Sequence, residues 1–206
     1  EDNDFPEGFL NAESILVTTV NRMFNGKNIF DRDRIVPAAV IIDDAHRCVE
    51  KVIDSFTIKV SSEHKLYDKL LNLFSADLKN QSLGSFEAMT GGAQGYYLKV
   101  SFCSWLDNLD KVTSLLAKYI DDIETMLFKW NLVQNNLAQY EMFVDCNRIE
   151  ISPMISQVEN IIAYDKAQFK YALSATFAND DSLMNDLGFS FESILNPLTP
   201  KKDRQD

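Results

Sequence analysis

Apolar and polar residues have one spacing near the ends of the chain and another in its middle. Near the ends, short apolar runs rich in β-branched residues predict buried strands at 14–19, 36–42 and 171–173. The run 36–42 is apolar on both faces, as is typical of a central parallel strand that helices cover on each side. Helical patterns at 47–54 and 180–187 follow two of these strands, so the ends of the chain predict an α/β fold.

The middle of the chain has the period of an α-helix. From 102 to 130, apolar residues recur at steps of three and four, which predicts one long helix or two helices broken near 121–122. A preceding helix, capped by one of the serines at 61–62, carries apolar residues at the same spacing. The stretch 82–95 is rich in glycine and predicts a flexible loop.

Two strand patterns border this helical middle. Apolar and polar residues alternate at 56–60, and a strand pattern returns at 141–152. The most economical division is one α/β domain that carries a mainly helical insertion. We therefore expect 1–56 and 141–206 to form the two parts of the α/β domain and 57–140 to form the insertion.

The composition is that of a globular protein, with 46% hydrophobic and 25% charged residues in a length of 206. Lys and Arg number 20 and Asp and Glu number 31, so the net charge is −11. This charge repels polyanions and disfavours tight nucleic-acid binding by the chain alone, unless a local basic patch or a basic partner domain reverses it. Because no apolar run approaches the roughly 18 residues of a membrane span, we expect no membrane partner.

Residues suited to redox or metal chemistry are few. The three cysteines, Cys48, Cys103 and Cys146, are scattered and cannot form a four-cysteine cluster, which favours a reduced, intracellular protein. We accordingly expect a cytoplasmic location. The two histidines, His46 and His64, are too few for zinc sites built on three histidine ligands.

Candidate chemistry follows the buried strand at 36–42, where the chain continues as Asp43-Asp44-Ala45-His46. Two adjacent carboxylates in such a place repel each other unless a cation or hydrogen-bond donors compensate them. Mg²⁺ bound to a nucleotide is a suitable cation, because it takes one or two protein carboxylates and keeps several waters. Asp43 would then hold the metal through water, Asp44 would polarise an attacking water, and His46 would reach the loop of a neighbouring strand. The alternative is a solvated turn that caps the next helix.

Two further segments favour the metal site over the solvated turn. Residues 15–19 read Ile-Leu-Val-Thr-Thr, residues 40–46 read Val-Ile-Ile-Asp-Asp-Ala-His, and residues 173–177 read Leu-Ser-Ala-Thr-Phe. In this order they resemble the first RecA-like domain of superfamily 2 helicases of the DEAD/DEAH type. The resemblance covers roughly 1–56 and 145–200 and implies a partial RecA-like, P-loop NTPase parallel sheet with the helical insertion between its motifs.

The resemblance also implies roles in ATP hydrolysis. Residues 43–46 match the Walker B motif, in which Asp43 would coordinate the Mg²⁺ of ATP–Mg²⁺. Asp44 stands where the family usually has the catalytic glutamate, one methylene longer. His46 would contact Ser174 or Thr176, which match the Ser-Ala-Thr motif, and would couple hydrolysis to unwinding.

Thr18 and Thr19 resemble the family motif that grips the nucleic-acid backbone, so the implied partners are DNA or RNA and the remaining helicase domains of a larger parent. No G-x-x-x-x-G-K-[ST] motif occurs in the 206 residues, and the glycine cluster at 90–97 lacks its Lys-Ser/Thr. The second RecA-like domain, with its arginine finger, does not occur either. Because the first residue is Glu1, we expect the chain to be a piece of a longer helicase. ATP and Mg²⁺ would then be used only by the intact parent.

The rival hypothesis is a non-catalytic, helicase-like module whose helical insertion binds a partner protein. Within the insertion, Lys111, Lys118 and Lys129 are interspersed with more numerous acidic residues, which favours a solvated charged face over a strand-binding surface. Trp105 and Trp130 lie at helical core spacing, which favours core positions over base-stacking platforms.

Overall fold

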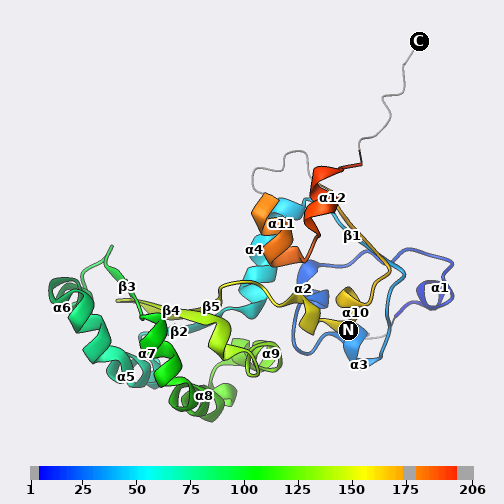
Figure 1. Cartoon of the computed structure of the whole chain (residues 1–206). Coiled ribbons are helices and arrows are strands. Elements are labelled where there is room, and N and C mark those ends of the chain that lie inside the picture. Colours follow the sequence, from blue (N-terminus) through cyan, green and yellow to red (C-terminus); the bar gives the residue numbers. More distant parts are fainter. Residues whose placement is uncertain (1–4, 174–179, 199–206) are drawn as a thin grey trace.

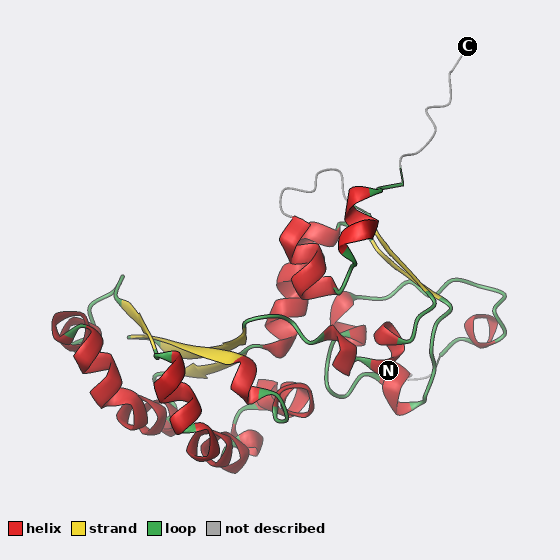
Figure 2. Cartoon of the chain, viewed as in Figure 1, coloured by secondary structure: helices red, strands yellow, loops and turns green. Residues whose placement is uncertain are grey.

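The computed structural model describes residues 5–173 and 180–198 and has a mixed α/β fold in two lobes (Figure 1). The insertion lobe is residues 57–153, and the parallel-strand lobe is the rest of the described chain. Helices, strands and loops are distinguished in Figure 2. No helix within the described ranges combines the length and the apolar character that crossing a bilayer requires.

The parallel-strand lobe consists mostly of short elements. In chain order these are α1 (Glu7–Leu10), α2 (Val20–Met23), α3 (Ile29–Arg32), β1 (Ala39–Ile42), α4 (Ala45–Phe56), the 3₁₀ turn η3 (Val158–Asn160), α10 (Ile162–Asp165), β6 (Phe169–Ala172), α11 (Asp180–Leu187) and α12 (Phe191–Leu195). Strands β1 and β6 pair in parallel, with Ala39 opposite Phe169 and Ile42 opposite Ala172. The apolar runs ending at Ile42 and Leu173 both lead into polar motifs, which predicts that they are neighbours in one parallel sheet. The pairing confirms this prediction although the insertion separates the two strands in sequence.

The insertion lobe contains longer helices and an antiparallel sheet. In chain order its elements are β2 (Ile58–Ser61), α5 (Lys65–Gln81), α6 (Leu83–Thr90), β3 (Tyr97–Lys99), α7 (Phe102–Asp107), α8 (Leu109–Lys118), η1 (Ile120–Asp122), α9 (Glu124–Val133), η2 (Leu137–Gln139), β4 (Tyr140–Asp145) and β5 (Arg148–Pro153). The strand order is β2-β5-β4-β3. Along β2, Ile58 and Val60 are buried while Lys59 and Ser61 are exposed, as expected for a sheet that helices cover on one face (Figure 2).

The sheet pairing revises the expected boundary at residue 140. The sequence places the strand pattern at 141–152 in the second part of the α/β domain, but β4 and β5 hydrogen-bond to each other and to β3 and β2. Residues 140–153 therefore belong with the insertion lobe. Strand pairing depends on partners distant in sequence, and the alternation within a strand does not reveal which sheet it joins.

Several helices also differ from the expected pattern. The stripe from 102 to 130 is divided into α7, α8 and α9, with the break near 121–122 confirmed as η1 and another break at Asn108. The expected loop at 82–95 contains α6, because the Ser82 hydroxyl accepts a hydrogen bond from the Ser85 amide and caps that helix. The cap of α5 is the His64 imidazole rather than a serine.

Residues 14–19 do not form the strand that their β-branched composition predicts. They have no ladder partner in the described chain, and Ile15 and Val17 are 87% and 91% exposed. A strand requires a neighbour to complete its hydrogen bonds, so strand propensity alone is insufficient. In contrast, the helix expected at 180–187 is confirmed as α11, which ends at Gly188 with a left-handed φ of 69°.

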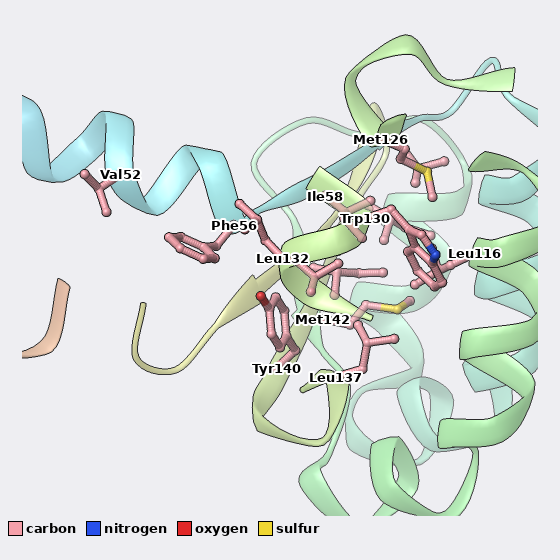
Figure 3. Packing of buried hydrophobic residues seen from close by; sticks show 14 of the residues in the cluster. Val52, Phe56, Ile58, Leu116, Met126, Trp130, Leu132, Leu137, Tyr140 and Met142 are labelled. Atoms are coloured by element: carbon pink, nitrogen blue, oxygen red, sulfur yellow. The ribbon is translucent and has the colours of Figure 1, made fainter. Parts of the chain in front are cut away.

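One hydrophobic core runs through both lobes (Figure 3). Val52 and Phe56 on α4 are fully buried, and the core continues through Ile58 into Tyr140 and Met142 of the insertion lobe. Burial of this apolar surface joins the lobes across the α4–β2 connection. Trp105 and Trp130 are also buried in this core, as their helical spacing predicts.

Two buried tyrosines differ in one hydrogen bond and allow a matched test. The Tyr164 hydroxyl donates to the Leu187 carbonyl at 2.7 Å, whereas the Tyr140 hydroxyl has no partner among the described residues. We expect Tyr164→Phe to lower the free energy of unfolding by about 1–3 kcal/mol, because it leaves a buried carbonyl unpaired. Tyr140→Phe should leave it unchanged or raise it. Urea unfolding of both variants measures this, and equal losses would contradict the assignment.

Candidate functional site

The candidate site lies where β1 ends and α4 begins. Asp43 and Asp44 form the turn between them, and both side chains are exposed. Asp44 adopts a left-handed backbone conformation, with φ 48° and ψ 53°. Asp tolerates this region better than most residues do, which gives a physical reason for the short carboxylate at this position. The Asp43 carboxylate accepts a hydrogen bond from the Asp44 amide at 3.0 Å.

The end of β6 lies against this turn. The Leu173 amide donates to the Ile42 carbonyl at 2.8 Å, and the Ala45 amide donates to the Leu173 carbonyl at 2.9 Å. The carboxyl ends of the two parallel strands therefore meet at the start of α4. Ser174 and Thr176, the residues expected to couple with His46, lie outside the described residues.

The electrostatics at the turn are those of a solvated surface. The Arg47 guanidinium lies 3.4 Å from the Asp44 carboxylate, and both side chains are exposed, so this pair contributes little to stability. The Cys48 thiol donates to the Asp43 carbonyl at 3.2 Å. Burial, and then the Asp44 and Asp43 carboxylates, raise the pKa of Cys48, so its thiol stays protonated at neutral pH.

The donor set at the turn suits one kind of metal site. No cluster of three or more His, Cys, Asp and Glu able to hold a metal ion occurs in the described part of the chain. Mg²⁺ commonly takes only one or two protein carboxylates and completes its shell with water and substrate phosphates. Two carboxylates would be enough for such an ion only if a nucleotide supplied the remaining ligands. His46 is exposed on the first turn of α4.

Thr18 and Thr19 precede a helix that packs against α4. Both threonines are exposed, and Thr19 is extended immediately before α2. Helix α2 packs against α4, the helix that begins at the Asp43–Asp44 turn. The threonine segment and the carboxylate turn therefore belong to neighbouring elements of one lobe, although the expected strand at 14–19 is absent.

No model of a known protein family matches the chain, and a search of curated proteins finds no match. The function of the chain is therefore inferred from its own residues and geometry.

Proposed function

We propose that the chain is a segment of the first RecA-like domain of an ATP-dependent nucleic-acid helicase or translocase of the DEAD/DEAH type. The parallel pairing of β1 with β6 is the observation that carries this proposal. It brings the end of the strand that precedes Asp43 beside the end of the strand that precedes Ser174. Open α/β sheets bind ligands outside the carboxyl ends of their parallel strands.

The small size of the parallel sheet supports the proposal that further strands complete it. Parallel sheets are normally covered on both faces, and a two-stranded sheet is marginal by itself. Within the described residues the sheet has only β1 and β6. Ile41 is 59% exposed, Phe169 48% and Tyr171 38%. This apolar surface fits a RecA-like sheet whose other strands come from the remaining parts of the parent.

In the proposed function, the chain supplies one side of an ATP site. Asp43 would hold the Mg²⁺ of ATP through water, and Asp44 would orient the water that attacks the terminal phosphate. His46 would link this turn to the Ser174–Thr176 motif. Thr18 and Thr19 would contact the DNA or RNA backbone.

A non-catalytic module that binds a partner protein is the second candidate. The exposure of the turn favours it, because the side chains of Asp43, Asp44 and Arg47 all lie in solvent. In this case the turn would be a solvated helix start, and the insertion lobe would be the binding surface.

An ATPase assay on two proteins separates the candidates. We expect the intact polypeptide that contains this chain to hydrolyse ATP with Mg²⁺ and to be stimulated by DNA or RNA. The 206-residue chain alone should show no turnover, because phosphoryl transfer also needs a phosphate cradle and a charge-stabilising arginine. No turnover by the intact polypeptide with either nucleic acid would favour the binding module. Robust turnover by the chain alone would mean that its phosphate site lies elsewhere.

A further inference from the structure

A cavity of about 510 Å³ lies between the two lobes, away from the Asp43–Asp44 turn. One wall comes from α2, α3 and the loop between them, and the other comes from the end of α4 and from α9. In Figure 1, α9 lies on the side of the insertion lobe that faces α2 and α3. We call it the interlobe pocket, and the charged and exposed aromatic residues in its lining are Arg22, Lys27, Arg32, Asp54, Phe128 and Lys129.

The interlobe pocket is cationic although the chain is acidic. Four cationic side chains and one carboxylate, Asp54, line it. The Asp54 carboxylate already faces two ammonium groups, Lys59 at 2.5 Å and Lys129 at 3.4 Å. Arg32 forms a two-point ion pair with Asp33. Arg22 and Lys27 therefore provide the excess positive charge that an anion would meet.

Partly buried hydrogen bonds join the two elements of the second wall, α9 and the end of α4. The Lys129 side chain is only 14% exposed, and its ammonium group donates to the carbonyls of Asp54 at 2.6 Å and Thr57 at 2.8 Å. Burial lowers the pKa of Lys129, and the Asp54 carboxylate opposes that shift. The solvated position that the sequence favours for Lys129 is therefore wrong: this lysine anchors α9 to the end of α4.

The loop from α2 to α3 is held against α9 at Gly26. Its amide donates to the Phe128 carbonyl at 2.6 Å, and the Asn131 amide group donates to the Gly26 carbonyl at 3.3 Å. A Cβ at position 26 would lie 2.7 Å from the Phe128 carbonyl oxygen, so only glycine allows this approach. The two walls are thus fixed relative to each other, and the pocket is preformed.

An exposed aromatic ring lies beside the cations. Phe128 is 46% exposed, and the Lys27 ammonium lies 5.3 Å from the centre of its ring. Sites for single-stranded nucleic acids combine cations that follow the phosphates with aromatic rings on which bases stack. Arg22 on α2 also follows Thr18 and Thr19 within one helical turn.

We propose that the interlobe pocket binds a single-stranded nucleic acid, with a phosphate at Arg22 and Lys27 and a base stacked on Phe128. This inference rests on the proposed helicase function and assigns the insertion lobe a role in holding the strand. The net charge of −11 does not prevent it, because salt screens charges beyond about 10 Å at 0.1 M ionic strength. Local cations then dominate the contact.

The test uses the 206-residue chain and fluorescence anisotropy of a labelled oligothymidine and a labelled oligouridine, titrated at low and near-physiological salt. We expect weak, salt-dependent binding to at least one strand. Lys27→Ala and Arg22→Ala should each reduce the slope of log affinity against log salt by about one. Phe128→Ala should weaken binding at least about fivefold. The matched control is Lys69→Ala, which removes an exposed cation on α5 outside the pocket.

Two results would overturn the inference: no binding to either strand at low salt, or Lys27→Ala and Phe128→Ala variants that bind like Lys69→Ala. Circular dichroism verifies that each variant is folded. ATPase assays of the intact polypeptide distinguish a failure of the pocket inference from a failure of the proposed helicase function. If the interlobe pocket does not bind the strand, Lys27→Ala retains stimulation of the ATPase by nucleic acid. If the helicase function is wrong, the intact polypeptide lacks ATPase activity while the pocket variants still lose strand binding.

Discussion

In the intact polypeptide, Asp44→Asn is expected to lower ATP hydrolysis by about 10²- to 10⁴-fold, the usual contribution of a positioned general base. Asparagine retains the size of Asp44 and removes its charge, so the variant isolates the loss of water activation. Asp43→Ala should lower hydrolysis by about 100-fold, the upper end of the usual cost of losing an outer-shell metal partner. The measurement is steady-state hydrolysis with saturating nucleic acid.

The two aspartate variants should respond differently to metal. Raising the Mg²⁺ concentration should partly restore Asp43→Ala, because that variant binds the metal more weakly. The same change should not restore Asp44→Asn. Glu50→Gln is the matched control, since Glu50 is an exposed carboxylate on α4 beyond the turn. Unchanged hydrolysis in Asp44→Asn would show that this carboxylate does not orient the attacking water.

The largest loss of stability is expected from Trp105→Ala. The Trp105 side chain is 1% exposed, stacks on Phe74 with ring centres 6.0 Å apart, and donates from Nε1 to the Leu137 carbonyl at 2.8 Å. Truncation leaves a cavity and an unpaired carbonyl, so we expect a loss of about 3–5 kcal/mol in the free energy of unfolding. Urea unfolding followed by circular dichroism measures this loss.

Phe102→Ala is the control for Trp105→Ala, because it removes a large aromatic side chain from the same helix, α7, where Phe102 is 52% exposed. This variant should change stability by no more than about 0.5 kcal/mol. If the two variants unfold at the same urea concentration, Trp105 does not hold the core together. Trp105→Phe retains the ring and should lose less than Trp105→Ala.

The sequence by itself predicted the features that local chemistry decides. The apolar run that ends at Ile42, the polar turn at Asp43 and Asp44, and the helix after it follow from the order of side chains over a few residues. The apolar run that ends at Leu173 likewise forms a strand, β6, although its pairing with β1 joins residues far apart in sequence. The positions of Trp105 and Trp130 in the core followed from helical spacing, which determines the face on which a side chain lies.

Only the tertiary structure decided which distant segments meet. The strands at 140–153 join the insertion sheet because their partners are β2 and β3, and residues 14–19 remain unpaired in the described chain. The interlobe pocket depends on Gly26 meeting the Phe128 carbonyl and on Lys129 meeting the end of α4. The physical reason is common to all of these. Hydrogen bonding and burial stabilise contacts between residues far apart in sequence, and no local pattern specifies such contacts.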